Sequence, residues 1–276
     1  MSSSASTQLR RVGICGLGTI GKALARTLDD GRLPGLTLAA ASVRDPANVQ
    51  DWMNGNLRSP ITLAPLHELA RHCDIVVECA PAAILAEVAE PTLQQGKRIV
   101  VLSVGALLEL PHLIDLARHT GGQIIIPTGA LLGLDAVTAA AEGHIHSVRM
   151  VTHKPVSGLV GAPFLAEQDI DISSLREPQL LYQGNARGAA RGFPANVNVA
   201  AALALAGIGA ERTQVEIWAN PTVTRNTHTI EVDSDSASFT MTIRNIPTDN
   251  PKTGRITVQS LTAALRKMHA PLRVGT

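Results

Sequence analysis

Short apolar segments alternate with helical patterns through the first half of the chain, and this alternation restricts the fold more than any other feature. The apolar segments are residues 11–15, 36–43, 75–79, 98–102 and 123–127. Helical periodicity is clearest between them at residues 20–29, 82–95 and 111–119. Strands that are apolar throughout must be covered on both faces, as in a parallel sheet with helices on each side. The alternation therefore predicts a doubly wound α/β domain over residues 8–130.

The second half of the chain changes to a period of two, which is typical of strands with one covered face. In the clearest segment, Phe239, Met241 and Ile243 alternate with polar residues. Similar segments at residues 147–154, 214–219 and 227–232 bring the number of strands to at least four. A helix rich in Ala and Leu, residues 196–206, is expected to cover this sheet. We therefore expect a C-terminal α+β domain with a mainly antiparallel sheet over residues 131–250.

The last segment of the chain, residues 251–276, contains an amphipathic helix. Its apolar stripe consists of Ile256, Val258, Leu261, Leu265 and Met268. We expect this helix to return to the first domain.

Composition restricts the partners of the protein. The 24 Lys and Arg residues nearly balance the 23 Asp and Glu residues, so the chain has no strong field for a nucleic acid backbone or an anionic membrane. Aromatic residues are only 2% of the 276 residues, too few for platforms on which bases stack. The N-terminal residues are polar, and no segment has the length and apolarity of a membrane span. We expect a cytoplasmic protein that binds neither nucleic acid nor membrane.

The three cysteines indicate neither a disulfide framework nor a metal site. Cys15, Cys73 and Cys79 are odd in number and lie in apolar segments, without CxxC spacing or a nearby pair of histidines. We expect no bound metal.

The strongest local motif is Gly16-Leu17-Gly18-Thr19-Ile20-Gly21, which begins where the first apolar segment ends and leads into the first helix. In this context Gly16 permits a sharp turn, Gly18 lets the backbone approach a pyrophosphate, and Gly21 lets helix and strand pack closely. Thr19 and Ile20 open the helix, whose N-terminus would face the anion. The motif predicts a Rossmann dinucleotide-binding domain, and a purely structural glycine turn is the alternative.

The tip of the second strand leaves the choice between NAD and NADP open. A carboxylate at this position binds the adenosine ribose in many such domains. Here the segment ends Ser42-Val43-Arg44-Asp45, so Arg44 can hold a 2′-phosphate or stack on adenine, whereas Asp45 can bind the ribose.

Two further turns follow predicted strands, where this fold binds its ligand. Cys79-Ala80-Pro81 follows the third apolar segment, and Ser103 follows the fourth. Small residues at these positions leave room for a nicotinamide ribose, although ordinary loop packing also explains them.

His228 and Lys154 are the candidate chemical groups of the second half. His228 shares a strand face with Ile230 and Val232 and therefore points toward covered space. A structural histidine and a catalytic histidine both fit this pattern. Lys154 continues the inward face of its strand, and a buried ammonium needs an anion, such as a substrate carboxylate, unless it reaches water at the strand end.

The chain as a whole resembles the L-aspartate dehydrogenase family, from about residue 11 to its C-terminus. The resemblance rests on GLGTIG at 16–21, SVGAL at 103–107, IPTGALLGLDAV at 126–137, THKP at 152–155, FPANVNVAAALALAG at 193–207, NTHTIEV at 226–232 and NPKTGRIT at 250–257. It implies an N-terminal Rossmann domain, a C-terminal α+β domain similar to that of dihydrodipicolinate reductase, and a homodimer.

The resemblance also implies functional residues. The family's catalytic histidine falls on His228, and its nicotinamide contacts fall on Ala130, Asn196 and Asn198. Many members carry an aspartate at the tip of the second strand, where this chain has Val43 and Arg44, and many have TRKP where it has THKP at residues 152–155. The first difference opposes a strict preference for NAD.

The implied reaction is oxidation of L-aspartate to an imine by NAD or NADP, followed by hydrolysis to oxaloacetate and ammonia, and its reverse. The resemblance also implies that an imine released before hydrolysis feeds pyridine nucleotide synthesis. We assign Lys154, Lys252, Thr253 and Arg255 to the two substrate carboxylates, because small residues and a helix N-terminus suit an anion. A reductase of the dihydrodipicolinate type, another two-domain oxidoreductase and a non-catalytic NAD(P)H sensor are the alternatives.

Overall fold

A computed structural model describes residues 9–194, 197–248 and 254–276, and contacts between Cα atoms divide the chain into two compact units. The first unit contains the described residues of Met1–Ser103, Leu110–Pro127 and Leu261–Arg273. The second unit contains the described residues of Val104–Glu109, Thr128–Ser260 and Val274–Thr276.

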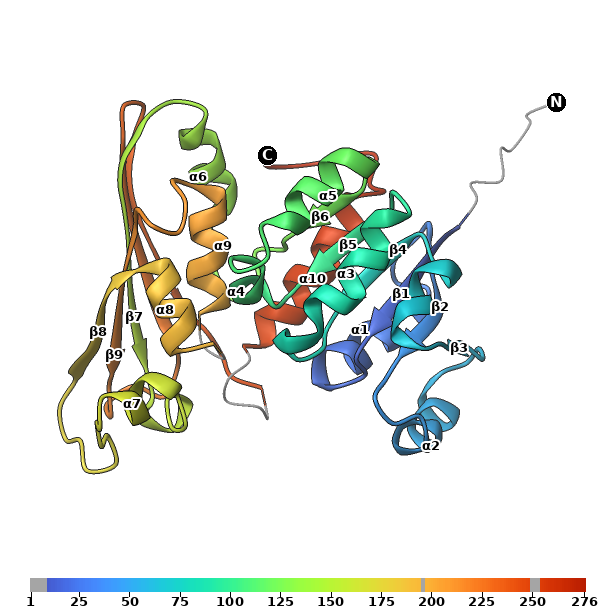
Figure 1. Cartoon of the computed structure of the whole chain (residues 1–276), viewed down its shortest axis with the longest axis horizontal. Helices are drawn as coiled ribbons and strands as arrows, with labels where there is room; N and C mark the ends of the chain where they lie inside the picture. The colour runs from blue at the N-terminus through green and yellow to red at the C-terminus, as the bar shows by residue number, and fades with distance from the viewer. Residues whose placement is uncertain (1–8, 195–196, 249–253) are drawn as a thin grey trace. The chain divides into compact units, whose positions relative to one another are not determined.

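The first unit is built on a six-stranded parallel sheet with the strand order β3-β2-β1-β4-β5-β6 (Figure 1). The strands are β1 (Arg10–Cys15), β2 (Leu36–Ser42), β3 (Thr62–Leu63), β4 (Ile75–Glu78), β5 (Arg98–Val101) and β6 (Gln123–Ile125). The helices between them are α1 (Thr19–Asp29), α2 (Ala47–Asn56), the 3-10 helices η1 (Leu66–His72) and η2 (Ala82–Ile84), α3 (Leu85–Gln94) and α5 (His112–Thr120). The predicted doubly wound α/β fold is confirmed.

Local sequence signals explain several of these boundaries. Every residue of β4 is buried, as expected of a central parallel strand. Helix α5 follows Pro111 and ends at Gly121, whose φ of 75° places it in the left-handed region that glycine tolerates best.

One cluster of the core of the first unit lies between its sheet and the helices α1 and α10 (Arg255–Lys267). Val12 and Ile14 of β1 contact a cluster that includes Leu24 and Leu28 of α1. Leu261 and Leu265 of α10 complete this cluster and are fully buried. The C-terminal half of the predicted apolar stripe therefore serves as core, with Met268 packed against it, whereas Ile256 at the start of the helix is exposed.

The second unit is built on a five-stranded sheet with the order β11-β10-β7-β9-β8 (Figure 1). The strands are β7 (Ile145–Lys154), β8 (Gln179–Asn185), β9 (Thr213–Ala219), β10 (Thr227–Ser234) and β11 (Ser238–Arg244). Three strand pairs are antiparallel, and the central pair of β7 and β9 is parallel. The mainly antiparallel sheet that the sequence predicts is thus confirmed, with one parallel pair and one unpredicted strand, β8.

The second unit also contains helices. They are α4 (Val104–Leu107), α6 (Leu134–Ala141), the 3-10 helix η3 (Val156–Gly158), α7 (Pro163–Glu167), α8 (Ala186–Gly192) and α9 (Asn198–Ala206), of which α8 and α9 contact β9 directly. Helix α4 packs on α9, and α7 packs on α8. The covered face alternates as predicted: Val148, Met150, Thr152 and Lys154 of β7 are all buried.

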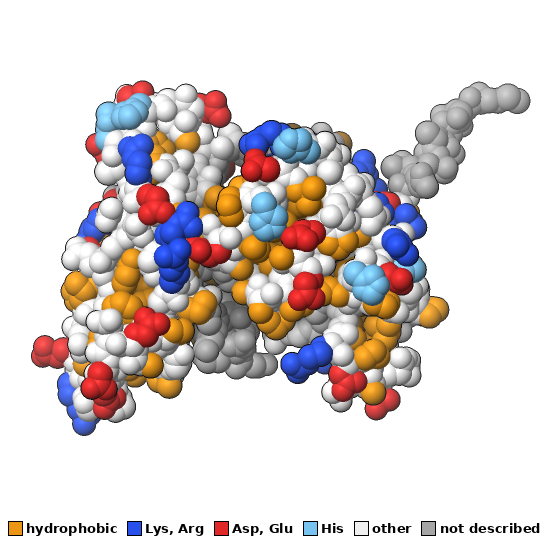
Figure 2. Space-filling model, viewed as in Figure 1, with side chains coloured by type: hydrophobic (Ala, Val, Ile, Leu, Met, Phe, Trp, Pro, Cys, Tyr) orange, Lys and Arg blue, Asp and Glu red, His pale blue; other side chains and the backbone are white. Residues whose placement is uncertain are grey.

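No helix in the described part of the chain combines the length and apolarity needed to cross a membrane. Figure 2 shows acidic and basic side chains interspersed over the face in view, as the near balance of the two charges leads one to expect.

Candidate active site

The three glycines of the turn between β1 and α1 have different surroundings and therefore different structural roles. Gly16 has a φ of +91°, and a Cβ there would lie 2.7 Å from the carbonyl oxygen of Cys79. A Cβ on Gly21 would lie 1.9 Å from the carbonyl oxygen of Gly16, so strand and helix approach as closely as a hydrogen side chain allows. Gly18 faces open space, with nothing within 4 Å of a Cβ.

The start of α1 fits a dinucleotide pyrophosphate. Gly18 is the N-cap residue, and the first turn, which begins at Thr19 and Ile20, contains no acidic residue. Its N–H groups and the helix dipole therefore offer a positive end to an anion.

At the tip of β2, the structure distinguishes Arg44 from Asp45, the two candidate residues for binding the adenosine ribose or its 2′-phosphate. Asp45 accepts hydrogen bonds from the Ala47 N–H (3.1 Å) and the Asn48 Nδ2 (2.6 Å), so its carboxylate holds the start of α2. Arg44 is exposed beside it. Of the two side chains, Arg44 is the one that local bonds leave available.

Glu78, at the end of β4, is a fully buried carboxylate surrounded by donors. It accepts hydrogen bonds from the N–H groups of Ala80 (2.9 Å), Leu102 (3.1 Å) and Ser103 (2.9 Å), and from the Ser103 hydroxyl (3.0 Å). Burial raises the pKa of Glu78, and these hydrogen bonds oppose the rise. One side chain thus holds the turns that follow β4 and β5.

The predicted cofactor residues after β4 and β5 are part of this arrangement. Ser103 is buried, and its hydroxyl also reaches the Ala80 carbonyl oxygen at 3.3 Å. Cys79 donates its N–H to the Cys15 carbonyl oxygen at 2.8 Å, and burial raises the pKa of its thiol, so the sulfur stays protonated. Pro81 is exposed.

Lys154 ends β7 on the covered face of the sheet and is only 3% exposed. Burial lowers the pKa of its ammonium group to about 8. Within residues 9–194, 197–248 and 254–276, its side chain forms no hydrogen bond or ion pair, and burial is the sole cause of its lowered pKa. A buried cation without a protein anion is costly, so the site favours an anionic ligand.

His228 lies near Lys154, on the neighbouring strand β10, and is 2% exposed. Its Nδ1 lies 2.5 Å from the hydroxyl oxygen of Thr152, directly opposite on β7. Burial, followed by the charge of Lys154, lowers the pKa of His228 to about 3, so the imidazole is neutral at physiological pH.

Ala130 and Asn198 have defined partners within the second unit. The Ala130 carbonyl oxygen accepts a hydrogen bond from Asn245 Nδ2 at 2.8 Å. Asn198, the first residue of α9, accepts one from the Gly105 N–H at 2.9 Å through Oδ1, which leaves its Nδ2 group available.

The predicted site residues fall into two groups. The glycine turn, Arg44, residues 79–81 and Ser103 belong to the first unit, and Ala130, Lys154, Asn198, His228 and Arg255 belong to the second. Arg255 is exposed at the start of α10. Asn196, Lys252 and Thr253 lie outside the described residues.

Sequence reasoning missed three buried polar residues: Glu78, Thr152 as the partner of His228, and Asn245. Glu78 is the one acidic residue of an otherwise apolar strand, which is a usable signal. Asn245 continues the alternation of Phe239, Met241 and Ile243 beyond the predicted end of that strand.

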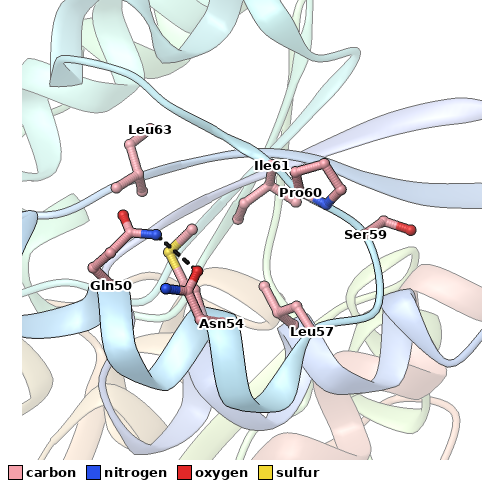
Figure 3. A pocket seen from close by; sticks show the side chains of 8 residues that line it. Gln50, Asn54, Leu57, Ser59, Pro60, Ile61 and Leu63 are labelled. Atoms are coloured by element: carbon pink, nitrogen blue, oxygen red, sulfur yellow. Dashed lines mark hydrogen bonds between the residues drawn. The ribbon is translucent and has the colours of Figure 1, made fainter.

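A cavity of about 450 Å³ lies between α2 and the segment after it (Figure 3). Gln50 and Asn54 of α2 point into it and are joined by a hydrogen bond of 2.9 Å. Its lining contains none of the predicted site residues.

A parallel sheet whose first strand leads through this glycine turn into α1 is typical of NAD(P)-dependent dehydrogenases. The profile of the homoserine dehydrogenase NAD binding domain matches residues 16–127, and that of the aspartate dehydrogenase C-terminal domain matches residues 135–268. L-aspartate dehydrogenase 3 of Bordetella bronchiseptica is 62% identical over 265 residues, which are 96% of this chain and 97% of that protein. The chain belongs to the L-aspartate dehydrogenase family.

Two further relatives agree with this placement. L-aspartate dehydrogenase of Bradyrhizobium diazoefficiens is 58% identical over 273 residues, which cover 99% of this chain and 96% of that protein. The crystal structure of aspartate dehydrogenase from Thermotoga maritima superposes with a TM-score of 0.71 at 22% identity, covering 96% of this chain and 99% of that one. The latter similarity extends the agreement to the fold.

Proposed function

We propose that the protein oxidises L-aspartate with NAD or NADP to the imine, which hydrolyses to oxaloacetate and ammonia, and that it catalyses the reverse reductive amination. The relatives named above carry this activity in their names. The structural observation that supports it is the buried Lys154 ammonium beside the neutral His228 imidazole. This pair accommodates a ligand that brings both a carboxylate and a proton to be removed.

Lys154 binds one substrate carboxylate in this proposal. The charge that the described residues leave uncompensated becomes an ion pair when the anion arrives, and the attraction is strong because Lys154 is almost fully buried. Arg255, with Lys252 and Thr253, is assigned to the second carboxylate from the sequence alone.

His228 acts as the general base in this proposal. In the tautomer whose Nδ1–H donates to Thr152, the lone pair of Nε2 is free to accept a proton from the substrate ammonium or from the hydrolytic water. Burial is the larger cause of the lowered pKa of His228 and the charge of Lys154 the second; a bound dicarboxylate opposes this charge and so raises the pKa.

The glycine turn and the start of α1 would hold the pyrophosphate, and Ala130 and Asn198 would contact the nicotinamide amide. The bound cofactor supplies the acceptor for the hydride that leaves the α-carbon. The protein's remaining task is to hold that carbon in place while the ammonium loses its proton. Water then adds to the imine carbon, and ammonia leaves.

We also propose a homodimer that forms through the outer face of the second sheet. His153 stacks on Trp218 there, with ring centroids 5.6 Å apart, and Leu180 is 37% exposed. Arg149 flanks them and pairs with Glu216 and Glu231. An apolar centre with a charged margin is typical of a protein interface. Sedimentation equilibrium tests this, and a monomer at micromolar concentration contradicts it.

The decisive test of function is a substrate panel followed by absorbance at 340 nm. L-aspartate is expected to reduce NAD or NADP, whereas L-alanine, L-glutamate and L-asparagine are not. A reductase of the dihydrodipicolinate type would instead act on cyclic imines. A sensor would bind NADH without any aspartate-dependent change in absorbance.

A further inference from the structure

Strand pairing places three polar side chains in one row beside His228. Thr227 of β10 pairs with His153 of β7 and with Arg244 of β11. One residue further toward this end of the strands, the Asn245 N–H donates to the Asn226 carbonyl oxygen at 2.8 Å, and Lys154 follows His153 on the other side of β10. Because alternate residues share a face, this row lies on the same face as Thr152 and His228.

Asn245 is 3% exposed, and the orientation of its amide is fixed by chemistry. The Ala130 carbonyl oxygen can only accept, so the atom 2.8 Å from it must be the donor Nδ2. The amide oxygen Oδ1 is then left buried with no hydrogen-bond partner in the described part of the chain. Such an unused acceptor destabilises a fold unless a ligand supplies the donor.

Asn245 also lines a cavity of about 300 Å³ at this end of the strands. The cavity is bounded by the segments that follow β7, precede β10 and follow β11, and Ser157, Thr224 and Asn226 contribute polar side chains to it. No acidic residue is among the described residues that line it. Lys154 immediately precedes the first of these segments, at Pro155.

We infer that Asn245 Oδ1 accepts a hydrogen bond from the α-amino group of the substrate. An amide oxygen repels a carboxylate and attracts an N–H group, whereas Lys154 has the opposite preference. The row therefore distinguishes the two ends of an amino dicarboxylate, with the cation at one end and the acceptor at the other. The inference rests on the proposed function, since it assigns the amine of that substrate.

The role also fits the chemistry. After the ammonium loses one proton, the amine still has N–H groups to donate, so the bond to Asn245 persists as the imine forms. Asn245 also donates a hydrogen bond from Nδ2 to the Ala130 carbonyl oxygen. One side chain would therefore contact the substrate amine through Oδ1 and the segment predicted to contact the nicotinamide through Nδ2.

The test compares ligands with and without the amine. L-aspartate and succinate are titrated into the NADH complex of the wild type and of Asn245→Ala, with NADH fluorescence as the readout. The dissociation constant of aspartate should rise about tenfold or more in the variant, whereas that of succinate, which has no N–H to donate, should change less than twofold. Thr240→Ala, on the opposite face of β11, should change neither value.

Asn245→Ser provides a second variant that lacks the amide oxygen and is titrated if the alanine variant does not fold. Equal weakening of aspartate and succinate would show that Asn245 only supports the Ala130 segment, and unchanged aspartate binding would exclude the contact; either result overturns the inference alone. A wild type that binds neither dicarboxylate would instead overturn the proposed function on which the inference rests.

Discussion

The Thr152 hydroxyl oxygen lies 2.5 Å from His228 Nδ1, across the paired strands β7 and β10, and both side chains are almost fully buried. This contact fixes the plane of the imidazole and leaves Nε2 as the nitrogen available for chemistry. A ring held in this way has little freedom to compensate for a displaced substrate.

Replacing His228 with Asn should lower kcat for aspartate oxidation by about a hundredfold or more, because general acid–base groups contribute on this scale. The Kd of NADH should change little, since the cofactor residues of the first unit are untouched. Steady-state kinetics and fluorescence titration measure the two quantities. Near-normal kcat in this variant would remove His228 from the mechanism.

Lys154→Met should bind aspartate poorly yet stabilise the protein without ligand at pH 7. The pKa of Lys154 falls from 10.5 to about 8 on folding, which corresponds to a penalty on the order of 3 kcal/mol. Between these pH values the unfolded chain binds more protons, so wild-type stability rises with pH from about 8 to 10.5 and the variant lacks this rise. Urea unfolding across this range tests the sign, and identical pH profiles would contradict it.

Two glycine substitutions should separate cofactor binding from folding. Gly18→Ala meets open space, so the protein should fold normally but bind NADH at least about tenfold more weakly, because the methyl group occupies the approach of the pyrophosphate. Gly21→Ala places a carbon 1.9 Å from the Gly16 carbonyl oxygen and should destabilise the fold itself. Thermal unfolding and NADH titration distinguish them, and equal effects on both readouts would contradict the assignment.

Arg44→Asp should shift the cofactor preference toward NAD. The variant loses the cation available for a 2′-phosphate, and the ratio of kcat/KM for NADP to that for NAD should fall by about tenfold or more. Arg71→Asp, an exposed arginine in η1, is the control for the change in net charge. A similar shift in both variants would point to long-range charge instead of contact.

Glu78→Gln should weaken the turns after β4 and β5 together. Glutamine replaces one acceptor oxygen by a donor facing other N–H groups, so we expect a loss of about 1–3 kcal/mol in stability and weaker NADH binding. Glu87→Gln, an exposed residue of α3, is the matched control. Unchanged stability in Glu78→Gln would mean that the four hydrogen bonds contribute little.

Most of the correct predictions of strands and of inward-facing residues came from local hydrophobic periodicity. The central strands of the first unit are apolar and short, and the inward positions of Lys154 and His228 follow from alternation alone. Strand β8 was missed because its residues do not alternate cleanly, and its exposed and buried positions are irregular. The parallel pairing of β7 with β9 joins residues 65 positions apart, such as Val148 and Thr213, which no local pattern encodes.

The same limit applies to the site. The acceptor role of Glu78 joins it to Leu102 and Ser103, 24 and 25 residues away, and only the folded sheet brings them together. Asn245 lies one position past the observed end of β11 and two past the predicted end of this strand at Ile243, so the alternation was not extended to it.

The Glu78 carboxylate has a consequence for engineering. Residues 78–80 and 102–103 share one acceptor, so they behave as a single module although they are distant in the sequence. A chimaera that exchanges one of these turns with that of another dehydrogenase would separate the donors from their acceptor. Both turns have to be transplanted together.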